Sequence, residues 1–93
     1  MSVDRIANAR LRDRVVSAEA AAALIQPGET VAMSGFTGSG YPKSVPLALA
    51  SRIEAEHAAG NPFRVSIWTG ASTGPELDGA LAKANGIEFR LPY

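Results

Sequence analysis

The apolar residues of the chain fall into short clusters, which polar stretches and glycine or proline residues separate. Three clusters have the length expected of strands: 30–33 (TVAM), 64–68 (RVSIW) and 87–91 (IEFRL). Two stretches with helical spacing lie between them: 44–59 and 75–85. The order strand, helix, strand, helix, strand favours a parallel sheet with right-handed crossovers. The sequence therefore predicts an α/β fold built as a small βαβαβ unit over residues 29–93.

The longer predicted helix follows a glycine-rich stretch and begins at Pro42 or Ser44. Pro46 is tolerated there because the first turn of a helix has N–H groups without intrahelical partners. Its expected buried stripe consists of Val45, Leu49, Ala50 and Ile53. The residues expected to face solvent are Arg52, Glu54 and Glu56. The turn signal Gly60-Asn61-Pro62 is expected to end this helix.

Residues 1–28 are expected to form a helical lead-in to the βαβαβ unit. A short helix is predicted over 4–14, with Ile6, Leu11 and Val15 on one side of an arginine-rich surface. Ser17 is predicted to cap a second helix, which carries an acid in its first turn and ends at Pro27-Gly28.

Composition narrows the classes of function. The 93 residues allow one small domain, and nine basic side chains balance nine acidic ones. This balance argues against a nucleic-acid partner, because a duplex-binding domain needs a basic face. The chain has no cysteine, which excludes disulfides and thiolate metal sites and is compatible with a reducing cytosol. The N-terminus shows no signal peptide, and no apolar run has the length of a membrane span. A cytoplasmic protein without membrane contact is expected.

Two similar loops follow the first two predicted strands. The first contains Met33-Ser34-Gly35-Phe36-Thr37-Gly38, and the second runs from Trp68 to Gly74 as WTGASTG. Both lie at the carboxyl edge of a parallel sheet, where open α/β folds bind ligands. Each leads into a helix N-terminus, which favours a carboxylate or a phosphate. The specific phosphate motifs fail, because Lys43 stands where a dinucleotide fingerprint needs glycine and too far from Gly40 for a Walker loop.

Other polar and aromatic side chains are assigned ordinary structural roles. His57 is expected to be an exposed residue near a helix end, and the lack of a second His or Cys leaves zinc without a ligand set. Glu76, directly after Pro75, is interpreted as a first-turn acid rather than a general base. Trp68 is expected in the core or as a wall of a crevice. Neither loop has the GxSxG pattern of a nucleophile elbow.

The chain resembles the amino-terminal segment of the acetyl-CoA hydrolase/transferase family, and most closely the succinyl-CoA:acetate CoA-transferases. The resemblance lies in the runs RIANARLRDRVVSAEAAAALIQPGETVAMSGF, SGFTGSGYPKSVPLALA and TGASTGPELDGALAKANGIEFRLPY, which together cover nearly the whole chain. It implies that residues 1–93 are a partial amino-terminal α/β domain. In the family, two α/β halves enclose the active site, and an active-site glutamate becomes a glutamyl-CoA thioester.

The resemblance implies no catalytic residue in this chain. The nucleophilic glutamate, the glycine-rich CoA-binding segment and the oxyanion-hole groups correspond to positions beyond residue 93. None of the glutamates present matches the motif: Glu19, Glu29, Glu54, Glu56, Glu76 and Glu88. CoA and its acyl esters, acetyl-CoA or succinyl-CoA, are implied as substrates together with a short carboxylate such as acetate, so no cofactor and no metal are expected.

The same resemblance implies that this segment supplies part of a carboxylate pocket. Ser72, the serine of the GAS motif, would lie by the bound carboxylate. Gly35, Phe36 and Thr37 would shape the pocket beside it, with Phe36 excluding water and limiting the size of the acid. The remainder of a CoA-transferase chain would complete the site.

Two alternatives to an enzyme segment stay open: a free-standing anion-binding module without chemistry, and an inactive truncated fragment. A three-stranded parallel unit leaves sheet edges and apolar surface uncovered, which predicts self-association, and a homo-oligomer is expected.

Overall fold

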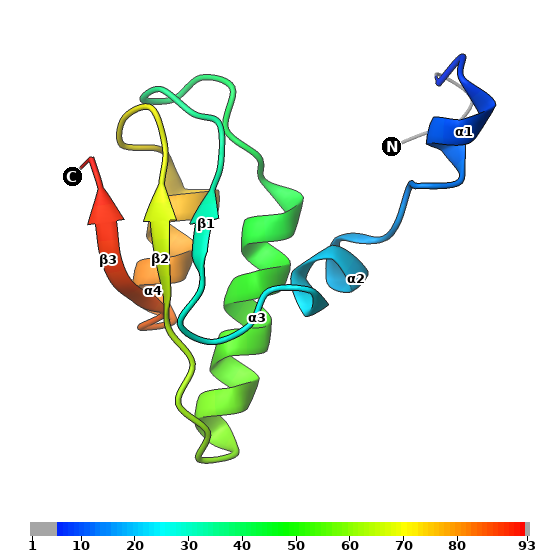
Figure 1. The fold of residues 1–93 in the computed structure, drawn as a ribbon. Helices are drawn as coiled ribbons and strands as arrows, with labels where there is room; N and C mark the ends of the chain where they lie inside the picture. The colour runs from blue at the N-terminus through cyan, green and yellow to red at the C-terminus, as the bar shows by residue number, and fades with distance from the viewer. Residues whose placement is uncertain (1–5, 93) are drawn as a thin grey trace.

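A three-stranded parallel sheet organises the chain, and a computed structural model describes it over residues 6–92 (Figure 1). The strands are β1 (Thr30–Ala32), β2 (Val65–Trp68) and β3 (Ile87–Leu91), in the order β1-β2-β3. Both neighbouring pairs are parallel, so all three strands end at the same edge. This confirms the predicted α/β fold with a parallel sheet and the βαβαβ order.

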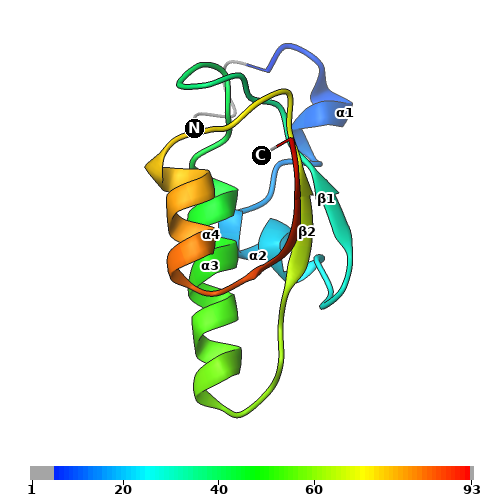
Figure 2. The same ribbon diagram turned by 90° about the vertical axis from the view of Figure 1, so that its left-hand side faces the viewer.

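The two crossover segments cover one face of the sheet (Figure 2). The first is α3 (Ser44–Ala58), which is 15 residues long and connects β1 to β2. The second begins as a π-helical turn, η2 (Pro75–Gly79), and continues as α4 (Ala80–Lys83). The left-handed Asn85, with φ of 55°, follows α4 and leads the chain into β3. The helix predicted over 75–85 is therefore present, although its first turn is π-helical.

The core lies between the sheet and these helices. Val65 and Ile67 alternate along β2 and are fully buried, because side chains two apart on a strand point to the same face. Leu49 and Ile53 stand four apart on α3 and face them, as the predicted stripe requires. Leu77 and Leu81 on η2 and α4, with Phe63 and Ala50, belong to the same buried set. Val45, the fourth residue of the predicted stripe, is half-buried.

The prediction that Arg52 faces solvent is wrong, because its side chain is half-buried against α2. Its guanidinium donates to the carbonyl of Ala22 at 2.8 Å and to the carbonyl of Ile25, at the end of α2 (Ala18–Ala23). The guanidinium also lies over the Phe63 ring, 4.6 Å from its centroid. The last carbonyls of a helix lack intrahelical donors, so an arginine on the neighbouring helix satisfies them and fastens α2 to α3.

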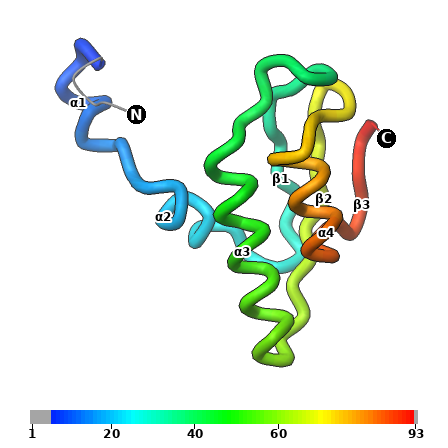
Figure 3. The backbone as a smooth tube through the Cα atoms, turned by 180° about the vertical axis from the view of Figure 1, so that it is seen from behind, coloured from blue at the N-terminus to red at the C-terminus, as the bar shows by residue number. Residues whose placement is uncertain are grey.

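The lead-in is less regular than predicted. Ser17 caps α2, and its hydroxyl accepts from the amide of Ala20 at 3.0 Å, which confirms that prediction. The helix predicted over 4–14 is one short turn, α1 (Ala9–Arg12), and residues 4 and 5 lie outside the described part. Of the three residues expected on its apolar side, Leu11 is 55% exposed, whereas Ile6 and Val15 are half-buried. Figure 3 shows α1 apart from the sheet.

The sheet face opposite the helices carries three large apolar side chains. Strand register places Phe89 beside Ser66 and Leu91 beside Trp68 on that face. Trp68 is 49% exposed, so it is not a core residue, which corrects the first of its two expected roles. Within residues 6–92, no helix is long and apolar enough to cross a membrane.

Candidate functional site

Two loops meet where β1 and β2 end. The first loop (residues 33–43) follows β1, and the second loop (residues 69–74) follows β2; both are at the top of Figure 1. The amide of Met33 donates to the carbonyl of Trp68 at 2.8 Å, which extends the strand pairing by one residue. Further on, the amide of Ala71 donates to the carbonyl of Gly35 at 3.1 Å. The two loops that the sequence pattern paired are thus joined directly.

Glycine is required where the two backbones approach. A Cβ on Gly70 would lie 2.7 Å from the Gly35 carbonyl oxygen, closer than such atoms approach in proteins. A Cβ on Gly35, whose φ is 153°, would lie 2.8 Å from the Cγ2 of Thr73 and 2.9 Å from the Cβ of Tyr41. These glycines therefore serve the contact between the loops, which is one reason for glycine near a site.

Tyr41 and Glu76 form a second connection, this time between the first loop and η2. The Tyr41 hydroxyl donates to the Glu76 carboxylate at 2.5 Å, and the Tyr41 side chain is almost entirely buried. The Lys43 ammonium lies 4.0 Å from the centre of the Tyr41 ring. The hydrogen bond raises the pKa of Tyr41 and lowers the pKa of Glu76, because it stabilises the neutral phenol and the charged carboxylate. Glu76 is a first-turn acid, as interpreted, and it is already hydrogen-bonded.

Asp78 and Arg90 lie below the second loop and were not identified from the sequence. Asp78 accepts from the amide of Thr73 at 2.6 Å and from its hydroxyl at 2.8 Å. Arg90 donates to the same carboxylate at 2.6 Å and 2.9 Å, and to the Ala71 carbonyl at 3.3 Å. Alternation along β3 would not have indicated Arg90, because it groups the apolar Ile87, Phe89 and Leu91 on one face and Arg90 on the other. The irregular register beside Val65 and Ser66 instead pairs Arg90 with the buried Ile67.

Hydrogen bonds from Arg90 and Thr73, together with the charge of Arg90, lower the pKa of Asp78. Its hydrogen bonds from Arg90 contribute most, and those from Thr73 add to them, so that the pKa falls from 3.8 to about 2. A carboxyl group whose pKa is lower in the folded state stabilises the fold above its unfolded pKa. That contribution is lost as the pH falls through the folded pKa.

We expect protonation of Asp78 to lower the free energy of unfolding by about 1–2 kcal/mol between pH 4 and pH 2. This figure allows for the solvent that screens the partly exposed Asp78–Arg90 pair. Urea unfolding curves of the wild type and of Asp78→Asn at both pH values measure this difference. The Asp78→Asn variant should lose less stability over the same interval, and Asp13→Asn on the exposed lead-in should behave like the wild type. Equal pH dependence in Asp78→Asn and the wild type would contradict the assignment.

The structure distributes the residues predicted to bind a carboxylate over both loops. Ser72 is exposed, and within residues 6–92 its hydroxyl has no protein hydrogen-bond partner. Gly35 lies in the contact between the loops. Phe36 is 66% exposed and pairs with Ser39 in a tight turn, where Thr37 has φ of 54°. Gly35 is thus joined to the second loop, whereas Phe36 and Thr37 form the tip of the first.

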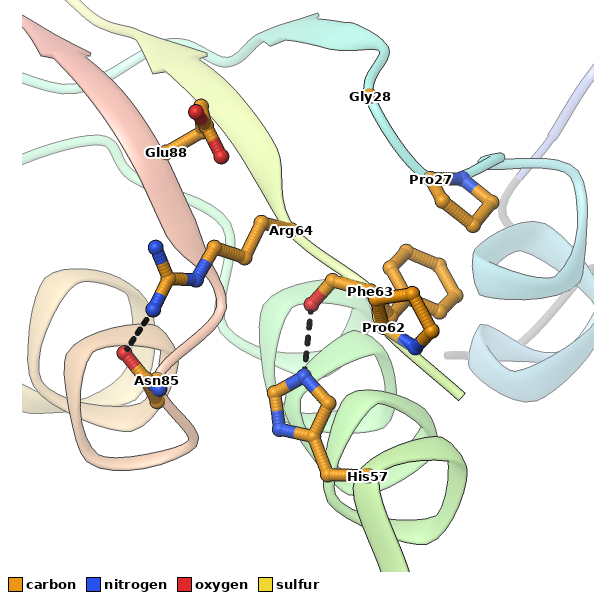
Figure 4. A pocket seen from close by; sticks show the side chains of 8 residues that line it. All are labelled: Pro27, Gly28, His57, Pro62, Phe63, Arg64, Asn85 and Glu88. Carbon is orange, nitrogen blue, oxygen red and sulfur yellow. Dashed lines mark hydrogen bonds between the residues drawn. The ribbon is translucent and has the colours of Figure 1, made fainter. Parts of the chain in front are cut away.

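A shallow hollow lies at the other edge of the sheet, where the strands begin (Figure 4). It is lined by Pro27, Gly28, His57, Pro62, Phe63, Arg64, Asn85 and Glu88. His57 is half-buried, not exposed as expected, because its Nε2 lies 3.0 Å from the Phe63 carbonyl oxygen. Arg64 donates to Asn85 at 3.2 Å. The part of the chain that the structure describes holds no cluster of three His, Cys, Asp or Glu side chains for a metal. The hollow is separate from both loops.

A family model and the similar proteins of known name point to the same protein family. The family model described as the acetyl-CoA hydrolase/transferase N-terminal domain matches residues 2–93. A succinyl-CoA:acetate CoA-transferase of Clostridium kluyveri is 49% identical over 89 residues, which cover 96% of this chain and 16% of that protein. A propanoyl-CoA:succinate CoA transferase of Escherichia coli is 40% identical over 84% of this chain and 16% of its own length.

The relatives include hydrolases as well as transferases. An acetyl-CoA hydrolase of Schizosaccharomyces pombe is 38% identical over 96% of this chain and 17% of its own length. The chain therefore spans about a sixth of the length of the curated relatives that it matches. With the model of the N-terminal domain matched from residue 2 to residue 93, the chain belongs to the acetyl-CoA hydrolase/transferase family.

Proposed function

We propose that this chain is the amino-terminal portion of an enzyme that moves CoA between an acyl-CoA and a short carboxylate such as acetate. Acetyl-CoA or succinyl-CoA is the proposed donor, and the remainder of the CoA-transferase chain is the proposed partner. In this assignment residues 1–28 are the lead-in and residues 29–93 are the first βαβαβ unit of a larger amino-terminal domain. The family match over residues 2–93 is the observation that carries the proposal.

In the proposed site, Ser72 binds the carboxylate. Its hydroxyl is exposed at the carboxyl edge of the sheet, next to the point where Ala71 contacts Gly35. A hydroxyl that donates to a carboxylate forms a charge-assisted hydrogen bond, which is stronger than one between neutral groups. The nearby Asp78 does not repel the ligand, because its charge is paired with Arg90. The exposed ring of Phe36 supplies apolar surface that can limit the size of the acid.

The chemical step needs a group that we place outside this chain. A carboxylate nucleophile must attack the acyl-CoA thioester and carry CoA as a glutamyl-CoA thioester. The Glu76 carboxylate already accepts a hydrogen bond from Tyr41 of the first loop, and Glu76 lies in the first turn of η2. We therefore propose a binding role, and no catalytic role, for residues 1–93.

The purified 93-residue chain, mixed with succinyl-CoA and acetate, is expected to form no acetyl-CoA above the uncatalysed rate, because we place the nucleophile outside this chain. Chromatographic separation of the CoA esters measures the product directly. Robust turnover by the chain alone would contradict the assignment, and Glu76→Gln would then show whether that carboxylate is responsible.

A non-catalytic anion-binding module is the second candidate. It is favoured by the position of the loops, since the first precedes α3 and the second precedes η2. Calorimetry with acetate, phosphate and CoA distinguishes the two proposals. A module that recognises only negative charge should bind phosphate at least as well as acetate, and Ser72→Ala should not change its affinity. A carboxylate pocket should prefer acetate, and Ser72→Ala should weaken its affinity for acetate. Cytoplasmic location and homo-oligomerisation stay predictions.

A further inference from the structure

Asp78 and Arg90 hold the backbone on both sides of Ser72. On one side, the Ala71 carbonyl accepts from Arg90 Nη2 at 3.3 Å, while the Ala71 amide donates to Gly35. On the other side, the amide and hydroxyl of Thr73 both donate to Asp78 Oδ2, at 2.6 Å and 2.8 Å. Two groups from different elements, η2 and β3, thus fix the neighbours of one exposed serine.

Arg90 has no donor left for a ligand. A guanidinium has five N–H groups. Nε donates to Asp78 Oδ1 at 2.6 Å, and Nη2 donates to Asp78 Oδ2 at 2.9 Å and to Ala71. Nη1 donates to the carbonyls of Leu91 at 2.7 Å and Pro92 at 3.0 Å. These bonds account for every N–H group, and only 14% of the side chain is exposed. A direct contact between Arg90 and a substrate carboxylate would require breaking one of them.

We propose that Asp78 and Arg90 are positioning residues, which fix the Ala71–Thr73 backbone and so direct the Ser72 hydroxyl toward the carboxylate. The part of this inference that concerns a carboxylate rests on the proposed function; the part that concerns the loop does not. A hydrogen-bonded arginine fork holds its partners in one geometry, which a single ammonium cannot reproduce. The conservative replacement Arg90→Lys therefore tests geometry separately from charge.

The test uses the 93-residue chain, labelled with ¹⁵N, as wild type, Arg90→Met, Arg90→Lys and Thr73→Val. Backbone order parameters of residues 71–73 are expected to fall from about 0.85 to below about 0.6 in both Arg90 variants, while those of β2 stay unchanged. The affinity for acetate, followed at the NMR signal of the Ser72 amide, is expected to weaken about five- to tenfold in the same two variants, because a loosened serine must be ordered on binding.

Two further variants serve as comparisons. Thr73→Val removes only the hydrogen bonds of the Thr73 hydroxyl and should loosen the loop less than the Arg90 variants do. Arg64→Met, at the opposite edge of the sheet, is the matched control and should change neither quantity.

A rigid loop in Arg90→Met and in Arg90→Lys would overturn the inference, as would a loss of order spread equally over β2 and the loop. If Arg90→Met does not fold, the comparison of Arg90→Lys and Thr73→Val with the wild type decides in the same way. Full rescue of loop order by Arg90→Lys would also count against the proposed fork. If the loop loosens but the wild type does not bind acetate, the positioning role stands and the proposal that Ser72 binds a carboxylate within residues 1–93 alone fails, whereas the family assignment is unaffected.

Discussion

Ile67→Ala is expected to lower the free energy of unfolding by about 2–5 kcal/mol, the usual cost of truncating a fully buried aliphatic side chain. Ile67 is on the middle strand, β2, with no exposed surface, and it faces the helices that cover one side of the sheet. Its removal leaves a cavity in the centre of a small core, where neighbouring side chains cannot all move to fill it. Urea unfolding followed by circular dichroism measures the loss.

Trp68→Ala is the matched comparison on the next residue of the same strand. Trp68 is larger, but it is 49% exposed on the open face of the sheet. We expect its truncation to cost less than that of Ile67, about 1 kcal/mol, because less of the removed surface is buried. A larger loss for Trp68→Ala than for Ile67→Ala in the monomeric chain would show that the open face, rather than the helix-covered face, holds the main core.

Gly70→Ala is expected to destabilise the chain by about 1–3 kcal/mol and to separate the two loops, because overpacking forces the backbone to shift. The new Cβ would lie 2.7 Å from the Gly35 carbonyl oxygen, and a backbone atom cannot rotate away as the end of a side chain can. The same carbonyl accepts from Ala71, so its displacement should also weaken that bond. Urea unfolding and amide hydrogen exchange at Ala71 measure the two effects.

Gly38→Ala provides the control within the first loop. A Cβ at Gly38 would meet nothing within 4 Å. This replacement should leave both the stability and the exchange of Ala71 close to those of the wild type. Similar losses for Gly38→Ala and Gly70→Ala would mean that glycine serves loop flexibility in general and not the contact between the backbones.

The fold could be predicted because its signals are local and repeated. Short apolar clusters alternate with helical spacing, and each boundary carries a glycine, a proline or a capping residue. The third strand was placed at Ile87–Leu91, the same bounds that the structure gives it. The meeting of the two loops followed from the parallel order alone, since parallel strands end at one edge.

The failures concern long polar side chains, whose partners are far away in sequence. Arg52 was expected to face solvent because it lies outside the buried stripe of the helix, yet it donates to the carbonyls of Ala22 and Ile25. The Asp78–Arg90 pair joins η2 to β3, and hydrophobic periodicity carries no information on such pairs. Trp68 was expected in the core or as a wall of a crevice, and strand alternation excludes the first role because it directs this side chain to the open face of the sheet.

Exchange of the matched segment tests the central claim most directly. In the Clostridium kluyveri transferase, this chain would replace the segment that is 49% identical to it. We expect the chimera to transfer CoA to acetate. We expect Ser72→Ala within it to raise the KM for acetate about ten- to a hundredfold, the effect of one lost hydrogen bond to a charged ligand. Ser51→Ala, an exposed serine on α3, serves as the control and should leave the KM unchanged. An active chimera in which Ser72→Ala and Ser51→Ala have the same KM for acetate would contradict the account.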